Sequence, residues 1–138
     1  MSFNEVAAPR GSETILIVDP DPETRKLAAF MLAKQGYTVL ESRDRTEALA
    51  RLAESGGGVQ MLLLDSRGRG CELADSMRRS DPRLQVLFLC RQSGPGYQLV
   101  VKSQLPFIKK PFTMHEIAGK VREVLDSGVK VMRAGDSF

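Results

Sequence analysis

Three apolar runs in this sequence each lead into a charged residue, and those residues are Asp19, Asp65 and Lys110. The runs cover residues 14–18, 61–64 and 106–108. Short apolar runs with β-branched residues are typical of buried strands in a parallel sheet. The carboxyl ends of parallel strands open onto one edge of the sheet, where ligands bind. The sequence therefore predicts that Asp19, Asp65 and Lys110 lie close together.

Strand-like and helix-like segments alternate along the chain. Further strands are expected at 37–40 and 84–89, and helices between the strands. Asp21 before Pro22 indicates the start of the first helix, and Asp44 with Glu47 the start of the second. Weaker signals predict helices at 72–79 and 99–102, with a loop at 92–96. Thr113 and Glu116 predict the last helix through a capping box.

Helical spacing of apolar residues identifies the faces that should be buried. The first helix is expected to bury Leu27, Phe30 and Met31. The remaining candidates are Ala48, Leu49, Leu52 and Ala53 in the second helix, and Ile117, Val121, Val124 and Leu125 in the last.

The order of elements predicts one α/β domain with parallel strands joined by right-handed helical crossovers. The length of 138 residues fits a single core. We expect the domain to span residues 13–126, with a leader or linker at 1–12 and a tail at 127–138.

Composition excludes several classes of protein. With 42% hydrophobic and 27% charged residues, the chain has the composition of a soluble globular protein. It contains no apolar run long enough for a membrane span and no signal peptide. Cys71 and Cys90 lack metal-ligand spacing and are interpreted as free thiols, so we expect a cytoplasmic protein.

The net charge of +3 is only mildly basic. Nucleic-acid-binding proteins usually concentrate lysine and arginine on one face. Here the basic residues are scattered, with small clusters at Arg67 and Arg69 and at Arg78, Arg79 and Arg83. We therefore expect a solvated surface, with no membrane partner and no nucleic-acid partner for this chain alone.

The segments 15–19, 62–65 and 110–113 have the residues and separations of known signalling motifs. In these features the chain resembles the response-regulator receiver domain, the CheY-like module of two-component signalling. The resemblance covers about the whole of 13–126. The sequence is most similar in character to receivers at the C-terminal end of hybrid sensor kinases. It implies a flavodoxin-like, doubly wound sheet of five parallel strands in the order 2-1-3-4-5.

The resemblance also implies roles for the three charged residues. Asp65 matches the aspartate that accepts a phosphoryl group, and Asp19 matches the first of two acids that hold Mg²⁺. Lys110 matches the lysine that pairs with the phosphoryl oxygens. Its bond to Pro111 is often cis in the family, which a prolyl bond permits.

The second acid of the family is missing, because Pro20 stands in its place and has no side-chain ligand. Asp21 comes one position too late and is interpreted as a helix cap within an acidic pocket. The loop after Asp65 lacks the Met-Pro turn and is shorter than usual, although this loop normally gives a backbone carbonyl to the metal. We therefore expect Mg²⁺ to bind much more weakly than in a receiver with paired acids.

The switch positions depart from the family as well. Cys90 replaces a Ser or Thr that donates a hydrogen bond to the phosphoryl group, and a thiol is a weak donor. Phe107 stands at the aromatic switch position and cannot form hydrogen bonds. Arg67, Arg69 and Arg91 are candidate substitutes for the metal, since a guanidinium can pair with Asp65.

Two functions within the family remain open. A phosphoacceptor receiver would take a phosphoryl group onto Asp65 from a histidine kinase. A degenerate receiver would keep the fold, lack Mg²⁺-dependent phosphorylation, and act through contacts with a histidine kinase or another signalling protein. We favour the degenerate receiver because of Pro20. An unrelated enzyme or flavin carrier is disfavoured, since no glycine-rich or Ser/Thr-rich phosphate loop follows the first strand; we expect no enzyme activity.

Overall fold

The computed structural model describes residues 7–67, 70–91 and 94–127, in which strands and helices alternate. The strands are β1 (Thr14–Val18), β2 (Thr38–Ser42), β3 (Met61–Asp65), β4 (Gln85–Cys90) and β5 (Phe107–Lys109). The helices are α1 (Pro22–Lys34), α2 (Arg45–Ser55), α3 (Gly70–Ser80), α4 (Pro95–Lys102) and α5 (Met114–Ser127). None of these helices is long and apolar enough to cross a membrane.

The five strands form one parallel sheet in the order β2-β1-β3-β4-β5, which confirms the predicted topology. In this order β1 lies between β2 and β3, with Ile15 opposite both Val39 and Met61. The residues that follow β1 and β3 are therefore neighbours at the carboxyl edge of the sheet. The turn after β5 reaches the same edge, because β5 pairs with β4 in the same direction.

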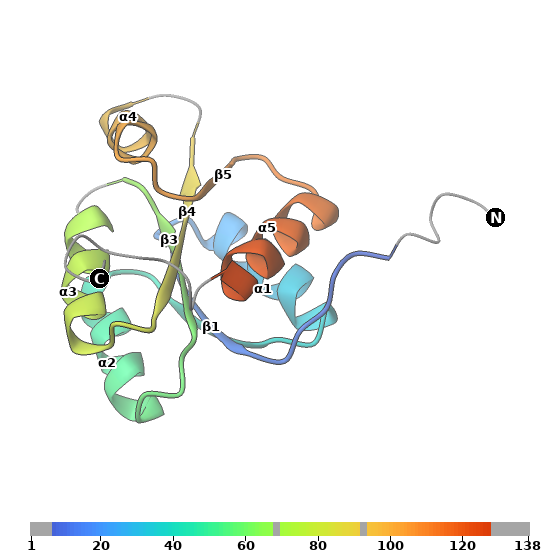
Figure 1. The fold of residues 1–138 in the computed structure, drawn as a ribbon, viewed down its shortest axis with the longest axis horizontal. Coiled ribbons are helices and arrows are strands. Elements are labelled where there is room, and N and C mark those ends of the chain that lie inside the picture. The colour runs from blue at the N-terminus through green and yellow to red at the C-terminus, as the bar shows by residue number, and fades with distance from the viewer. Residues whose placement is uncertain (1–6, 68–69, 92–93, 128–138) are drawn as a thin grey trace.

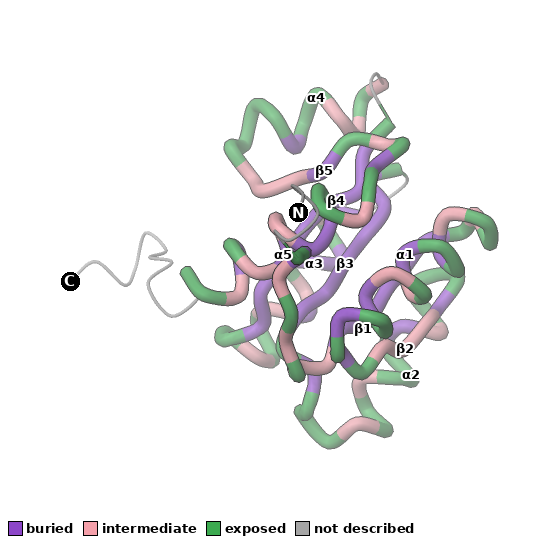
Figure 2. The backbone as a smooth tube through the Cα atoms, turned by 90° about the vertical axis from the view of Figure 1, so that its right-hand side faces the viewer, coloured by how far each residue is buried: buried purple, intermediate pink, exposed green. Residues whose placement is uncertain are grey.

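Helices cover both faces of the sheet (Figure 1). Ile15 and Ile17 pack in the core beneath α1 and α5, whereas Leu16 and Val18 pack in the core beneath α2, α3 and α4. Every residue of β3 is buried, as Figure 2 shows, because neither face of this central strand meets solvent. The short α4 is mostly exposed and buries only Val100.

The predicted helix starts are confirmed by the hydrogen bonds of their caps. Asp21 accepts a hydrogen bond from the backbone of Glu23 at the start of α1. Thr113 and Glu116 bond reciprocally, since each side chain accepts from the other's backbone N–H. Such caps satisfy N–H groups that have no partner inside the helix.

The predicted buried face of α1 is wrong for Leu27 and Phe30, whereas Met31 is half-buried and packs against the core as predicted. Leu27 and Phe30 are 46% and 60% exposed, whereas Ala28, Leu32 and Arg25 are buried. The buried residues of α1 also have helical spacing. Because they include a small residue and a charged one, hydrophobicity alone did not identify them. The small side chain of Ala28 lets α1 lie close to the sheet.

Several boundaries and one buried face also differ from the prediction. α3 begins at Gly70, and α4 begins at Pro95, inside the segment expected to be a loop. Proline suits the first turn of a helix, because its missing N–H would have no partner there. In α2, Ala48 is buried, but Leu49 is 41% exposed and Ala53 is exposed, so the predicted face is too wide.

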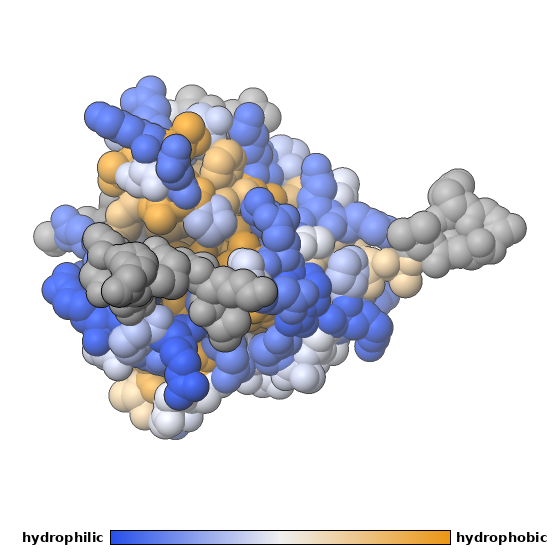
Figure 3. Space-filling model, in the orientation of Figure 1, coloured by the Kyte–Doolittle hydropathy of each residue, from blue (hydrophilic) through white to orange (hydrophobic). Residues whose placement is uncertain are grey.

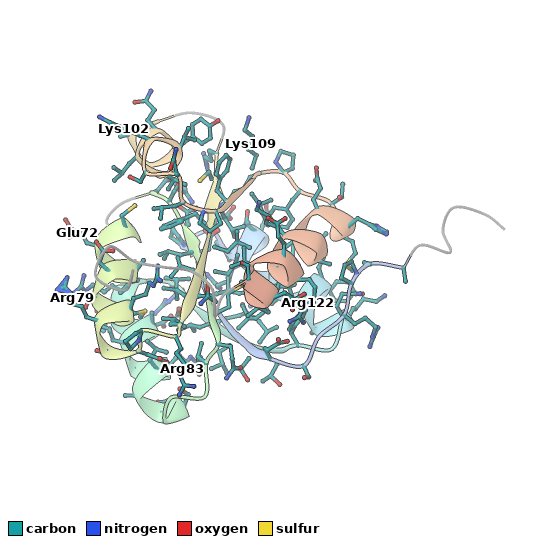
Figure 4. The ribbon with its side chains drawn as sticks, viewed as in Figure 1. Glu72, Arg79, Arg83, Lys102, Lys109 and Arg122 are labelled. Atoms are coloured by element: carbon teal, nitrogen blue, oxygen red, sulfur yellow. The ribbon has the colours of Figure 1, made fainter. Side chains whose placement is uncertain are left out.

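Residues 7–12 form no helix or strand but lie against the domain. The side-chain amide of Gln35 donates hydrogen bonds to the carbonyls of Ala8 and Pro9. At Gly11, a Cβ atom would collide with the Tyr37 ring and the Arg122 guanidinium. Arg122 points from α5 toward this segment (Figure 4). The described part of the predicted leader is therefore packed against α1 and α5.

Candidate functional site

Three loops bring Asp19, Asp65 and Lys110 together at the carboxyl edge of the sheet. The Lys110 Nζ atom lies 2.8 Å from Asp19 Oδ2 and 2.6 Å from Asp65 Oδ2. Both carboxylates are buried, at 0% and 4% exposure. Buried carboxylates of this kind require cationic partners, because isolated charges are costly to remove from water.

The backbone around Lys110 places its side chain over the two acids. Its N–H donates a hydrogen bond of 2.8 Å to the carbonyl of Cys90, the last residue of β4. The following bond to Pro111 is cis. Lys110 is thereby tied to the strand that neighbours β3, on whose end Asp65 lies.

Arg67 is the second cation of the site, and its guanidinium donates two parallel hydrogen bonds to Asp65. Its Nε lies 2.9 Å from Oδ1 and its Nη2 lies 3.0 Å from Oδ2. The backbone N–H of Arg67 donates a third bond, of 2.7 Å, to Oδ1. The same Nη2 lies 3.5 Å from Asp19 Oδ1, so one guanidinium bridges both acids.

This arrangement keeps Asp65 ionised. Burial raises the pKa of its carboxyl group, but the hydrogen bonds from Arg67 and Lys110 outweigh burial and leave the pKa below its usual value. In return, the hydrogen bond to Asp65 raises the pKa of the Arg67 guanidinium. Two anions and two cations thus form one connected set of ion pairs at this edge of the sheet.

Pro20 and Asp21 leave this set without a third carboxylate. Pro20 is exposed and offers no side-chain oxygen. The oxygens of Asp21 accept hydrogen bonds from Glu23 N–H and from the hydroxyl of Thr24, at 3.2 and 2.7 Å. The Thr24 bond is the main reason that the pKa of Asp21 is lowered. The side chain of Asp21 therefore serves α1 as its N-cap.

A magnesium ion does not fit the donor atoms that remain. Mg²⁺ requires oxygen ligands in near-octahedral geometry, but cations already occupy the oxygens of Asp19 and Asp65. Within the described residues, no group of three His, Cys, Asp or Glu side chains is placed to hold a metal ion. The residues at this edge suit a guanidinium better than a divalent metal.

The two switch positions differ in environment. Cys90 is fully buried at the end of β4, and burial raises the pKa of its thiol more than a hydrogen bond with Ser66 lowers it. Phe107 is half-buried and packs edge-to-face on Tyr97, with ring centroids 5.7 Å apart. Phe107 is therefore packed into the surface between α4 and β5.

The other two arginine candidates are not part of the described cluster. Arg69 lies outside the described residues. Arg91 is exposed and lines a hollow beside Asp21, Thr24 and Lys110. Within the described part of the chain, Arg91 forms no ion pair with Asp65. Of the two candidates within the described residues, Arg67 is the one that the structure brings to the acids.

Sequence reasoning missed Arg25, which supports the loop after β1. This buried side chain donates a hydrogen bond of 2.9 Å to the carbonyl of Asp19 and pairs with Glu41 at 3.2 Å. Its position one turn before Ala28 and two turns before Leu32 was an available signal. A charged residue on the buried stripe of a helix indicates a specific partner.

The residues 15–122 match the family described as "Response regulator receiver domain". This match covers most of the chain, and the fold and the positions of Asp19, Asp65 and Lys110 agree with it. The chain belongs to the response regulator receiver domain family, whose members act in two-component signalling.

Two curated relatives illustrate the range of proteins that carry such a domain. The chain is 28% identical over 121 residues to the sensor kinase CckA of Brucella abortus, covering 84% of this chain and 13% of that protein. It is 31% identical over 121 residues to the nitrogen assimilation regulatory protein NtrX of Azorhizobium caulinodans, covering 82% and 26%. The chain thus spans only a small part of these relatives.

Solved structures show the same fold at low sequence identity. A receiver domain protein from Clostridium thermocellum is similar with a TM-score of 0.73 and 17% identity, over 87% of this chain and 99% of that one. A CheY-like receiver protein from Methanospirillum hungatei gives a TM-score of 0.73 at 22% identity, over 87% and 98%. These similarities establish the fold. The chemistry of the domain has to be inferred from the residues of the site.

Proposed function

We propose that this domain is a degenerate receiver, which signals through protein–protein contacts without Mg²⁺-dependent phosphorylation and has no enzyme activity of its own. The observation that carries the proposal is the bidentate contact of Arg67 with both oxygens of Asp65. Pro20, which removes a metal ligand, supports it independently.

The chemistry of phosphoryl transfer explains why this contact matters. An aspartate that accepts a phosphoryl group needs a free oxygen, and a metal ion to neutralise the charge that accumulates on the phosphoryl group. In this chain Oδ1 accepts two hydrogen bonds from Arg67, and Oδ2 accepts one each from Arg67 and Lys110. A guanidinium supplies charge but no coordination sites, so it neutralises the carboxylate without recruiting phosphate as a metal would.

Exposed apolar side chains support signalling by contact. Leu27 and Phe30 on α1 lie three positions apart and are 46% and 60% exposed. Leu99 and Val101 are exposed on α4, and Figure 3 shows apolar surface gathered beside this helix. Adjacent exposed apolar side chains such as Leu27 and Phe30 are typical of interaction surfaces. Leu99 and Val101, in contrast, lie two positions apart and face different sides of α4.

The proposed partners are a histidine kinase or another signalling protein in the cytoplasm. A membrane or nucleic-acid partner is not part of the proposal. The labelled basic side chains Arg79, Lys102, Lys109 and Arg122 lie on different elements in Figure 4. Scattered cations of this kind do not form the continuous basic face that nucleic acid favours.

The alternative function is a phosphoacceptor receiver that takes a phosphoryl group onto Asp65 from a histidine kinase. It is favoured by Lys110, which lies where a phosphoryl oxygen would need a cation. The Arg67 side chain is also 40% exposed, so solvent can reach the group that would have to move.

The test is incubation of the protein with acetyl phosphate and Mg²⁺, followed by mass spectrometry of the intact chain. We expect no gain of one phosphoryl group. Stoichiometric labelling that disappears in Asp65→Asn would establish the phosphoacceptor function instead. The matched control is Asp81→Asn, because Asp81 lies at the end of α3 and removing its charge should leave any labelling unchanged.

A further inference from the structure

A second feature of this edge of the sheet is a hollow of about 370 Å³ between the loops that follow β1, β2 and β3. Its inner wall is apolar and contains Val18, Leu64 and Leu73, which are buried residues of β1, β3 and α3. Lys110 is not among its lining residues, because β5 lies at the far side of the sheet from β2. The hollow therefore lies on the β2 side of Asp65, and Asp65 and its partner Arg67 form part of its wall.

The rim of the hollow is basic. Arg43, Arg45 and Arg67 line it, from the loop before α2, from the first residue of α2 and from the loop after β3. The lining carboxylates, Asp44 and Asp65, already have partners. Asp44 accepts the cap hydrogen bond of α2 from Glu47 N–H at 3.0 Å, and Asp65 is held by the two cations described above.

The arginines retain unused donors. Arg45 is exposed and forms no ion pair within the described residues. Arg67 uses Nε and Nη2 on the acids, and its Nη1 donates no hydrogen bond in the described part of the chain. Arg43 is engaged with Glu47, which accepts bonds from its backbone N–H and its Nε and lies 2.8 Å from its Nη2, so Arg43 contributes charge to the rim but few unused donors.

Size and chemistry together define the class of ligand. Small-molecule sites usually have volumes of about 300–1,000 Å³ and mostly apolar walls with a few polar groups. A hollow of 370 Å³ is at the small end of that range. The guanidinium fork matches phosphate and carboxylate groups. Pro20, which also lines the hollow, contributes no negative charge that would repel an anion.

We propose that this hollow binds a small amphipathic anion, consisting of one apolar ring or short chain that carries a phosphate or carboxylate. The apolar part lies against Leu64 and Leu73, and the anion is bound by Arg45 and by the free Nη1 of Arg67. The proposal rests on the proposed function in one respect, because it uses the Nη1 of an Arg67 that stays bound to Asp65.

The binding site is tested by titrating phenyl phosphate into the isotopically labelled full chain and following the backbone amides by NMR. We expect saturable shifts that are centred on residues 43–45 and 64–67. Inorganic phosphate should bind at least about fivefold more weakly, because it lacks the apolar group that the wall would bury. Arg45→Ala should weaken phenyl phosphate by about fivefold or more, because a hydrogen bond to a charged group is lost.

Arg83→Ala is the matched control, because it removes the same charge from an exposed residue before β4, at the opposite edge of the sheet. This control should change the affinity less than about twofold, as expected for a distant surface site. The proposal is overturned if neither phenyl phosphate nor benzoate gives saturable shifts at the hollow. It is equally overturned if inorganic phosphate binds as tightly as phenyl phosphate, or if Arg83→Ala weakens binding as much as Arg45→Ala.

Discussion

The two sides of Asp65 differ in how far they keep the chemistry of a receiver domain. On the side of β4 and β5, Lys110 lies 2.6 Å from Asp65, with the cis bond to Pro111 behind it. On the side of β1 and β3, Pro20 stands where a metal ligand would lie, and Arg67 holds both oxygens of Asp65. One half of the site therefore retains its cation, while in the other half Pro20 offers no side-chain ligand and the Arg67 guanidinium holds Asp65.

This difference shows that the parts of a phosphorylation site can change separately. Lys110 contributes to the fold as well as to the site, because it neutralises two carboxylates that are almost fully buried. Pro20 is exposed, and Arg67 is 40% exposed, so changes on their side cost the fold less. A domain can lose its metal chemistry on the open side and keep the buried pair on the other.

The largest expected effect is that of Lys110→Met. This substitution keeps the length of the side chain but leaves Asp19 and Asp65 with Arg67 as their remaining cation. Breaking a buried ion pair typically costs about 3–5 kcal/mol, and we expect a loss of unfolding free energy near the lower end, about 3 kcal/mol. Urea denaturation followed by circular dichroism measures it, and a loss below about 1 kcal/mol would contradict the structural role of Lys110.

A smaller effect is expected for Arg67→Ala. The hydrogen bonds to Asp65 are charge-assisted, but the arginine is 40% exposed and water would replace part of what is lost. We expect a loss of about 1 kcal/mol in the same denaturation experiment. A loss as large as that of Lys110→Met would mean that the two sides of Asp65 support the fold equally.

The pH dependence of the unfolding free energy tests whether Asp65 is ionised beside Arg67. The folded-state pKa of Asp65 is lowered, so its stabilising contribution is fully present above the unfolded pKa of about 3.9 and is lost as the pH falls through the lower folded value. We therefore expect the difference in stability between the unmodified protein and Arg67→Ala to shrink as the pH falls below about 4. Urea denaturation at several pH values checks this, and a difference that grows toward low pH would contradict the ionised pair.

The smallest effect is expected for Arg91→Ala, the matched control for Arg67. Arg91 is exposed beside Lys110 and forms no ion pair with Asp65 within the described residues. Its removal should change the unfolding free energy by less than about 0.5 kcal/mol, as is usual for a surface substitution. A loss equal to that of Arg67→Ala would show that both arginines support Asp65 in solution.

The fold was predictable because several local signals agree with one another. The apolar runs, the caps at Asp21, Asp44 and Thr113, and the alternation of elements all lead to the same sheet. The meeting of Asp19, Asp65 and Lys110 followed from the parallel direction of the strands. These features depend on the spacing of apolar residues and on the order of the elements along the chain. Both can be read from a single sequence.

That Arg67 and not Arg91 pairs with Asp65 was not predictable, because it depends on the path of one loop. The backbone N–H of Arg67 bonds to Asp65, and this turn aims the guanidinium back at the same carboxylate. Arg25 was missed for a related reason. Hydrophobic scoring assigns a charged residue to the solvent side, whereas its hydrogen bond to the Asp19 carbonyl places it inside.

The most direct test of the central claim, that Arg67 occupies the place of the metal, is a Mg²⁺ titration followed by NMR of the backbone amides near Asp65. The unmodified protein should show no saturable binding at millimolar Mg²⁺, while Arg67→Ala combined with Pro20→Asp should bind the ion. The double variant frees the oxygens of Asp65 and restores an acid after β1. These are the two sets of oxygen ligands that the site needs in order to bind Mg²⁺. Tight Mg²⁺ binding by the unmodified protein would contradict the account.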